Sequence, residues 1–382
     1  MKIIIAIDSF KGSLSSMEAG KISSSAIKKI LPNAEVKIYP LADGGEGTVD
    51  AIVEGLNGEI VNVEVTNPLG KKFLSRYGKV NQTAIIEMAD AAGLTLIPEN
   101  QRNPLNTTTF GLGELILDAT KNNCHEFIIG IGGSATNDCG LGMLTALGFE
   151  FKDSQNKSVG IFGRDLEKVV AIDTSKVNPI IKNCKFKIAC DVNNPLTGFN
   201  GCSYIYAPQK GANVETVELM DGWIKNFASI SLSALNVDIK SAAGDGAAGG
   251  LGFAFRTFLN GELIKGVDLV LDLIKISNDL IDADLLITGE GKLDNQSVMG
   301  KAPVGIAKLA KSINEKILTV AVCGCASNEA VEVHNAGIDA YFTILQMPMS
   351  TTEAMKLEVT QTNLSQTVEE ILRLIIMRSS LR

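Results

Sequence analysis

The sequence predicts an α/β protein with two α/β domains. Short runs that are apolar on both faces, such as Lys2–Asp8, recur along the chain and alternate with helical patterns, which is typical of a parallel sheet covered by helices. Residues 59–89 instead predict an antiparallel meander, which indicates a change of domain. We therefore expect a discontinuous Rossmann/flavodoxin-like parallel-sheet domain, residues 1–58 plus 280–382, with a second α/β domain, residues 59–279, inserted in the middle of the chain.

The first 50 residues predict two strand–loop–helix units. The strand Lys2–Asp8 leads into the polar loop Ser9–Ser13, and Ser15 or Ser16 can cap a helix that ends before Pro32. A second strand, Glu35–Tyr39, ends in the acidic, glycine-rich loop 41–48. Because open α/β sheets bind ligands at the carboxyl ends of their strands, both loops are candidate binding sites.

The middle of the chain contains the most glycine-rich of the strand-to-helix turns. The stretch Glu126–Leu147 places Gly130–Gly133 and several hydroxyls between a short strand and a helix that begins near Leu141. Such a turn can hold a phosphate through free N–H groups and a helix N-terminus, or it can be an ordinary packed turn with an N-cap. The meander predicts strands over 60–66, 73–80 and 83–89; further elements are a threonine-capped helix 107–122, a strand 185–192 and a long helix that ends near Leu235.

The last third returns to alternating strands and helices. The strand Asp284–Thr288 is expected to end in a polar loop over 289–297, and Pro303 suits the first turn of a helix that ends near Ser312. The remaining elements are strands over 317–322 and 341–345 and helices over 328–335 and 359–377.

Composition excludes several classes of protein. The net charge is −8 with scattered lysines and arginines, which argues against nucleic-acid and membrane partners. The seven cysteines form no C-x-x-C pair, and Ile3–Ile7 is too short for the apolar part of a signal peptide. We expect a reduced, soluble, cytoplasmic protein. Only two histidines are present, so Ser-His-Asp hydrolysis and histidine-rich metal sites are excluded, and chemistry must rest on carboxylates, lysines, hydroxyls and N–H groups.

One G-x-G-x-x-G pattern, at Gly244, Gly246 and Gly249, is compatible with dinucleotide binding, with Asp268 or Asp272 as the ribose ligand. The acidic Asp245 within it disfavours a pyrophosphate, and a closely packed helix-start loop is the alternative interpretation.

Acidic residues recur with glycine and lysine at the ends of several predicted strands. Carboxylates that converge there suit Mg²⁺, which binds one or two carboxylates together with substrate phosphates, and lysines and N–H groups would stabilise a transferring phosphoryl group. A helix cap is the alternative role for each acid. These residues alone indicate a phosphate-handling α/β enzyme.

Seven stretches in order along the chain resemble the signatures of the type 1 glycerate kinases. They are DSFKGSLSS at 8–16, LADGGEGT at 41–48, GIGGSATND at 130–138, CDVNNPLTG at 190–198, PQKGA at 208–212, GAAGGLG at 246–252 and TGEGKLDNQSVMGKAP at 288–303. Cys139 departs from the family, which more often has glycine there, so this position is expected to be helical or to belong to an altered loop.

The resemblance implies an ATP-dependent kinase that phosphorylates a hydroxyl of D-glycerate, with 2-phosphoglycerate as the favoured product and 3-phosphoglycerate as the alternative. ATP and Mg²⁺ are the implied cofactors, and a homodimer is a candidate assembly. An NAD(P)-dependent oxidoreductase of a small hydroxy acid and a non-catalytic small-acid binding protein are the competing hypotheses.

We assign the catalytic roles as hypotheses. Asp191 would be the general base, assisted by Asp8, Lys11 and Lys292, and Glu290 and Asp294 would bind Mg²⁺. The sequence leaves open which loop binds ATP and which binds glycerate. The residues expected to bind substrate or phosphate are Ser9, Gly12, Ser13, Asp43, Gly44, Gly45, Glu46, Gly132, Gly133, Ser134, Thr136, Asn137, Asp138, Asn194, Gly246, Gly249, Gly289, Gly291, Gln296, Ser297 and Lys301.

Overall fold

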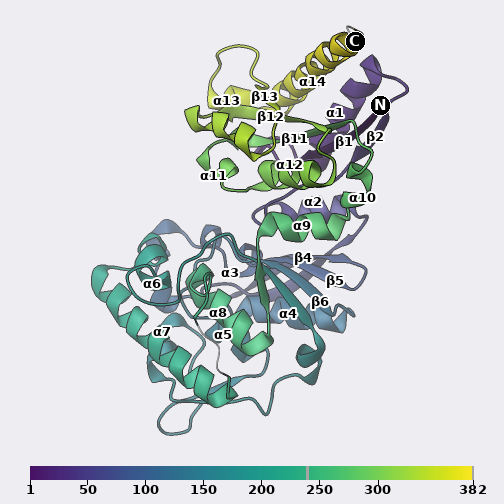
Figure 1. The fold of residues 1–382 in the computed structure, drawn as a ribbon. Coiled ribbons are helices and arrows are strands. Elements are labelled where there is room, and N and C mark those ends of the chain that lie inside the picture. The colour runs from purple at the N-terminus through teal and green to yellow at the C-terminus, as the bar shows by residue number, and fades with distance from the viewer. Residues whose placement is uncertain (238–240, 381–382) are drawn as a thin grey trace. The chain divides into compact units, whose positions relative to one another are not determined.

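The computed structural model describes residues 1–237 and 241–380, which fold into two compact units (Figure 1). Unit 1 consists of Met1–Asp43, Asp50–Asn57 and Val267–Arg382, and unit 2 consists of Gly44–Val49 and Gly58–Gly266. No helix in the described part of the chain is long and apolar enough to cross a membrane.

Unit 1 is built on a five-stranded parallel sheet with the order β13-β12-β11-β1-β2. The strands are β1 (Lys2–Ile7), β2 (Glu35–Ile38), β11 (Leu285–Leu293), β12 (Leu318–Ala326) and β13 (Ala340–Thr343). Numbered within the unit, this order is 2-1-3-4-5, which is the flavodoxin-like arrangement. Figure 1 shows the purple N-terminal strands and the green C-terminal strands joined in this sheet. The α/β class with a parallel sheet is confirmed.

Helices cover both faces of the unit 1 sheet. On one face, Ile3 and Ile5 of β1 pack in a common core with Ile27 of α1 and Leu372 of α14. On the other face, α12 and the 3-10 helix Asn328–Ala336 pack around the β12 strand. Ser15 caps α1 in a capping box with its third helical residue, as its position predicts. The helices are α1 (Ser16–Ile30), α2 (Thr48–Gly55), α9 (Gly266–Ile274), α10 (Ser277–Leu280), α11 (Asn295–Val298), α12 (Ala302–Ile313), α13 (Thr351–Ala354) and α14 (Leu357–Ser380).

Unit 2 contains a six-stranded mixed sheet with the order β10-β9-β6-β5-β4-β3. Its strands are β3 (Glu59–Thr66), β4 (Lys72–Val80), β5 (Thr83–Glu87), β6 (Glu126–Gly130), β9 (Lys185–Ala189) and β10 (Glu262–Ile264). Strands β3, β4 and β5 form the expected antiparallel meander, and β5, β6, β9 and β10 are parallel. A separate antiparallel pair is formed by β7 (Glu150–Lys152) and β8 (Ala171–Asp173).

A single large core stabilises unit 2, with aromatic pairs such as Phe127 stacked on Phe186 at a centroid distance of 4.9 Å. Burial of such rings is a major source of stability because each removes a large apolar area from water. The helices are α3 (Ala89–Ala92), α4 (Phe110–Lys121), α5 (Leu141–Ala146), α6 (Cys202–Tyr206), α7 (Val214–Leu235) and α8 (Ala247–Leu259). Short 3-10 helices span Leu94–Leu96, Glu99–Gln101, Pro104–Asn106, Gly163–Lys168, Pro179–Asn183 and Pro208–Lys210.

Two expectations about local structure are wrong. Residues 289–293, expected to form a loop, continue strand β11, because β12 also extends and pairs Glu290 with Cys323 and Lys292 with Cys325. The helix expected from 107 begins at Phe110, and Thr109 makes no side-chain cap for it. Both differences arise from tertiary contacts, which override local preference.

Candidate active site

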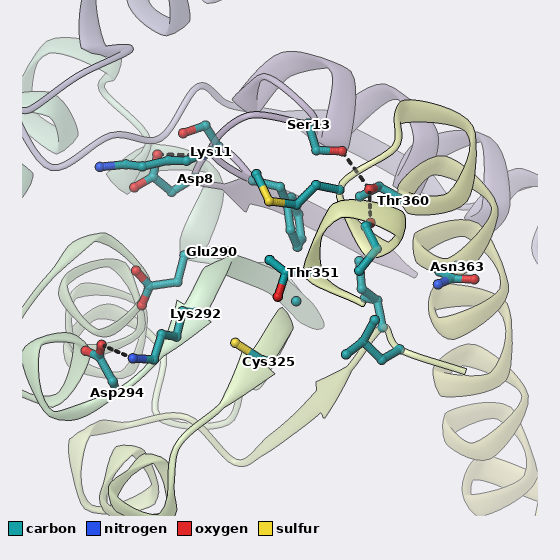
Figure 2. A pocket seen from close by; sticks show the side chains of 18 of the residues that line it. Asp8, Lys11, Ser13, Glu290, Lys292, Asp294, Cys325, Thr351, Thr360 and Asn363 are labelled. Carbon is teal, nitrogen blue, oxygen red and sulfur yellow. Dashed lines mark hydrogen bonds and ion pairs between the residues drawn. The ribbon is translucent and has the colours of Figure 1, made fainter. Parts of the chain in front are cut away.

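A pocket of about 390 Å³ opens in unit 1 at the carboxyl ends of β1 and β11. The strand order reverses between these two strands, and doubly wound sheets bind ligands at such a position. The charged residues that line the pocket, most of them visible in Figure 2, are Asp8, Lys11, Asp43, Glu290, Lys292, Asp294 and Lys301. Ser9, Ser13 and Gly291 also line it, so the fold brings these predicted site residues together from distant parts of the sequence.

Asp8 and Glu290 are the most buried acids of the pocket. The Ser9 N–H donates to Asp8 Oδ1 at 2.6 Å, and the Ser297 hydroxyl donates to Glu290 Oε1. Burial, reinforced by the negative charge of Asp43, raises the pKa of Asp8 to about 7. Burial also raises the pKa of Glu290 to about 7, although the Ser297 hydrogen bond opposes this. A cation in the pocket would lower both pKa values again, because it would stabilise the ionised carboxylates.

This set of donors fits a magnesium ion that is bound together with a phosphate. Asp8, Asp43 and Glu290 act on one another electrostatically. Among the described residues, however, no three acidic, histidine or cysteine side chains are close enough to bind a metal ion by themselves. Mg²⁺ usually binds one or two carboxylates and takes its other oxygen ligands from water and substrate phosphates. The pocket carboxylates would supply that protein share of the ligands if the ion were bound.

Three lysines place positive charge at the same pocket. Lys11 is exposed and its charge lowers the pKa of Asp8, while Lys301 acts in the same way on Glu290. Lys292 Nζ lies 3.4 Å from Asp294 Oδ2. The Asp294 carboxylate also accepts from the Gln296 N–H at 2.9 Å and caps α11, which gives Asp294 a structural role that Glu290 lacks.

Several predicted residues near the pocket support it rather than face it. Ser297 is buried, and its hydroxyl is used by Glu290. The Gln296 side chain is exposed. Gly289 lies within β11, where a Cβ would come 2.0 Å from Val322 O. Gly12 has φ +77°, which favours glycine; a Cβ there would come 2.6 Å from Met355 Cε, the end of a flexible side chain that can shift.

In unit 2 the loop after β6 presents three backbone N–H groups. No acceptor in the described part of the chain takes the N–H of Gly132, Gly133 or Ser134. Gly132 and Gly133 are exposed, and Gly133 has the left-handed φ of +72°. Consecutive N–H groups around a left-handed residue form the concave "nests" that bind anions. A Cβ at Gly132 would meet nothing within 4 Å, so the space in front of the loop is open.

Lys210 lies beneath this loop and is buried. Its ammonium donates to Ser134 Oγ at 2.7 Å and to Thr136 O at 2.6 Å. Burial lowers its pKa to about 8. Lys210 lies in the PQKGA stretch, where the sequence predicts no role for it, because a lysine in a turn ordinarily faces solvent. Its ammonium adds positive charge to the loop from the protein side.

Thr136, Asn137 and Asp138 point into unit 2 and are buried. Asn137 donates to Ser203 Oγ at 2.9 Å. The Asp138 carboxylate accepts from the N–H and hydroxyl of Thr109, at 2.9 and 2.7 Å, and from the Gly140 and Gly142 N–H groups at the start of α5. Asp138 therefore ties α4 to α5.

Cys139 adopts the left-handed φ of +50°, so of the two alternatives expected for this position the helical one is wrong and it belongs to a loop. Its side chain packs against Gly250, where a Cβ would come 2.8 Å from Cys139 Sγ. A glycine would adopt this conformation without strain, whereas cysteine is held there by burial between the two loops.

Asp191 emerges beside the N–H loop. Strands β6 and β9 are parallel neighbours that pair Gly130 with Ala189, so Gly132 and Asp191 each lie two residues beyond a paired position at the same sheet edge. Asp191 is exposed, and its Oδ1 accepts from the Gly266 N–H at 3.1 Å. Asn194 fixes the following turn, because it accepts from the Tyr206 hydroxyl at 2.5 Å and donates to Asn200 O at 2.9 Å.

The loop after residue 43 also reaches this edge of the unit 2 sheet. Gly44 has φ +84°, a Cβ on it would come 2.6 Å from Ala189 Cβ, and its carbonyl oxygen lies against Gly130. Gly45 and the exposed Glu46 continue the same loop. Glycine at position 44 thus permits close packing between the ends of β6 and β9.

The G-x-G-x-x-G stretch does not have the surroundings of a dinucleotide site. The described element before it is helix α7, and the stretch precedes β10 instead of following a strand. Asp245 is buried and forms an ion pair with Arg256 at 2.8 Å. Cβ atoms on Gly246 and Gly249 would come 2.2 Å from Pro195 O and 2.1 Å from Thr136 O. These glycines therefore permit close packing of loops, and the oxidoreductase hypothesis loses its structural basis.

Comparison with known proteins identifies relatives over nearly the whole chain. A sequence model of the glycerate kinase family matches residues 3–376. A glycerate kinase from Bacillus subtilis is 44% identical over 347 residues, covering 90% of both chains. The glycerate 2-kinase of Escherichia coli is 43% identical over 347 residues, covering 90% of this chain and 91% of that protein. A crystal structure of a protein provisionally assigned as glycerate kinase 2, from Salmonella typhimurium LT2, superposes with a TM-score of 0.92 at 40% identity, covering 100% and 99% of the two chains.

Proposed function

The chain belongs to the glycerate kinase family, and we propose that it transfers the γ-phosphoryl group of ATP to a hydroxyl of D-glycerate, with 2-phosphoglycerate as the favoured product. The 2-position is favoured because the similar Escherichia coli protein is named a glycerate 2-kinase. The observation that carries the proposal is the unit 1 pocket, which combines buried carboxylates with lysines at a ligand-binding position of the sheet.

We assign ATP to the unit 1 pocket. Lys11, Lys292 and Lys301 would contact the phosphates, and Glu290 with Asp8 would hold Mg²⁺. Asp294 stays a candidate ligand, although its carboxylate already caps α11. Mg²⁺, when bound, would offset the negative charge of the phosphates. The raised pKa values of Asp8 and Glu290 support this assignment, because a bound cation would stabilise their ionised forms at neutral pH.

We assign glycerate to unit 2. The free N–H groups of Gly132, Gly133 and Ser134 suit its carboxylate, and the buried Lys210 ammonium adds attraction from behind the loop. Asp191 emerges at the neighbouring strand end and would accept the proton of the reacting hydroxyl. The hydroxyl oxygen would then attack the γ-phosphorus, and the bond from that phosphorus to the ADP oxygen would break.

Release of ADP from Mg-ATP in the presence of D-glycerate tests this function. If the product is passed to enolase without a mutase, immediate formation of phosphoenolpyruvate indicates the 2-phosphate, and its absence indicates the 3-phosphate. The proposal is wrong if no ADP above background forms with glycerate or with related hydroxy acids.

A further inference from the structure

One end of the unit 1 pocket is lined by residues between 344 and 363, which contribute no charged side chain and are largely apolar. Ile344, Leu345, Met349, Ala354 and Met355 line it. Leu345 is 38% exposed and Met355 is 41% exposed. Figure 2 shows the charged side chains Asp8, Lys11, Glu290, Lys292 and Asp294 on one side of the pocket and Thr351, Thr360 and Asn363 on the other. The pocket is thus divided into a charged end and an apolar end.

The side-chain amide of Asn363 also lines this end, and it has no hydrogen-bond partner in the part of the chain that the structure describes. The Asn363 side chain on α14 is 8% exposed and lines the pocket. In residues 1–237 and 241–380, no group forms a hydrogen bond with this amide. The amide lines the pocket, so water or a ligand in the pocket can reach it, and a ligand that displaced the water would have to replace its hydrogen bonds. Its position at the pocket indicates that a ligand supplies the missing partner.

We propose that the apolar end binds the purine base of ATP and that Asn363 hydrogen-bonds the edge of that base. This inference rests on the proposed kinase function. A nucleoside triphosphate has a flat apolar base at one end and charged phosphates at the other, which matches the two ends of the pocket. An asparagine amide can donate to a ring nitrogen of adenine and accept from its amino group. Glycerate is small and polar throughout, and it would leave the apolar end unfilled.

The volume agrees with a nucleotide. At about 390 Å³ the pocket falls within the range of roughly 300–1,000 Å³ that is usual for cofactor-sized ligands. A three-carbon acid needs much less space. The side chains of Leu345 and Met355 are partly exposed and flexible, and they would pack on the two faces of a planar ring.

Two contacts join the apolar end to the charged end. The Ser13 hydroxyl donates to Thr360 Oγ1 at 2.6 Å, and Thr360 in turn donates to Ala354 O at 3.0 Å. Gly12 allows Met355 to approach the loop that carries Lys11. The base site and the phosphate site are therefore held in register by the loop after β1. This explains why Ser13, expected to bind substrate, uses its hydroxyl on α14.

The first test replaces Asn363 by leucine, with Gln366→Leu as the matched control, because Gln366 is an exposed amide on the same helix. Asn363→Leu is expected to raise the KM for ATP about tenfold, which corresponds to about 1.4 kcal/mol, while the KM for glycerate and kcat change less than about threefold. Met355→Gln should raise the KM for ATP in the same way. A raised KM for glycerate with an unchanged KM for ATP would overturn the proposal.

The second test uses the wild-type protein, so that it does not depend on the folding of a variant. Photolabelling with 8-azido-ATP, followed by peptide mapping, should place the label within residues 344–363 and should be blocked by excess ATP. Label confined to unit 2 would contradict the proposal. Failure of the kinase function itself would appear separately, as wild-type protein that binds the azido nucleotide but releases no ADP with glycerate.

Discussion

The unit 1 pocket and the unit 2 loop begin from the same sequence pattern and have opposite electrostatic character. Each places glycines and an acid at the end of a parallel strand. In unit 1 the Asp8 and Glu290 carboxylates line the cavity, where burial and nearby negative charges raise their pKa values to about 7. In unit 2 the Asp138 carboxylate turns inward, where it accepts from Thr109 and from two N–H groups at the start of α5. The difference shows that a carboxylate is available to a ligand only where hydrogen-bond donors of the protein do not already occupy its oxygens.

The two regions therefore suit different partners. In the proposed function the acidic pocket binds Mg-ATP, whereas the N–H loop above Lys210 binds glycerate.

The largest effect is expected from Asp191→Asn, which removes the proposed base from unit 2. General-base catalysis contributes roughly 10²- to 10⁴-fold, so kcat should fall within that range while the KM for ATP stays within about threefold. The control is Glu218→Gln, an exposed acid on α7. Near-normal turnover with an unchanged pH profile would show that Asp191 is not the base.

Removal of the buried ammonium in Lys210→Met should raise the KM for glycerate by roughly ten- to a hundredfold, since a hydrogen-bonded charge contributes about 1.5–3 kcal/mol. The KM for ATP should not change. The matched control is Lys225→Met, an exposed lysine on α7. An unchanged KM for glycerate in a folded Lys210→Met protein would remove the ammonium from the anion site.

The same residue predicts a pH dependence. Because burial lowers the pKa of Lys210 to about 8, its positive charge is lost as the pH rises through that value, and the KM for glycerate should rise with it. In Lys210→Met this rise should be absent. A rise of equal size in the variant would assign the titration to another group.

The stability of the metal-free protein should depend on pH because two carboxyl groups of unit 1, those of Asp8 and Glu290, titrate at different pH in the folded and unfolded states. The unfolded Asp8 and Glu290 carboxyls ionise near pH 4, but in the folded protein both have a pKa of about 7. The unfolded state therefore releases protons first, and the free energy of unfolding falls as the pH rises from about 4 to 7. In EDTA the Tm should drop by a few °C over this range. The double variant Asp8→Asn, Glu290→Gln should flatten this part of the curve, and an undiminished slope would contradict the assignment.

A smaller effect is expected from Gly133→Ala compared with Gly132→Ala. Gly133 has φ +72°, so alanine there should cost about 1 kcal/mol in thermal unfolding, whereas Gly132 has open space in front of it and should cost less. Equal destabilisation by both changes would mean that the conformation of the loop does not depend on the left-handed residue.

Local pattern was sufficient for much of the fold. The apolar run Lys2–Ile7 and the alternation between 59 and 87 predict their strands, and Ser15 predicts its helix cap. The extension of β11 to Leu293 could not be predicted, because glycines and charges in that stretch resemble a loop until β12 pairs with them. The catalytic and binding assignments stay proposals.

Individual site residues were harder to predict than the loops that carry them. The residues next to Asp138 do not show whether its carboxylate faces a ligand or caps a helix. Its role as a cap depends on Thr109, which is 29 residues earlier. Lys210 and Asn363 lie in helical or turn segments without a distinctive pattern, and only their burial beside a loop or a cavity marks them. Burial of polar groups is a tertiary property, which the order of residues does not encode locally.

Amide hydrogen exchange with each ligand alone tests the division of roles between the two units most directly. Mg-ADP is expected to protect the segments around Asp8 and Glu290 and the start of α14, and D-glycerate is expected to protect residues 130–138 and the segment around Asp191. Protection of the unit 1 segments by glycerate alone, together with protection of residues 130–138 by Mg-ADP alone, would contradict the account.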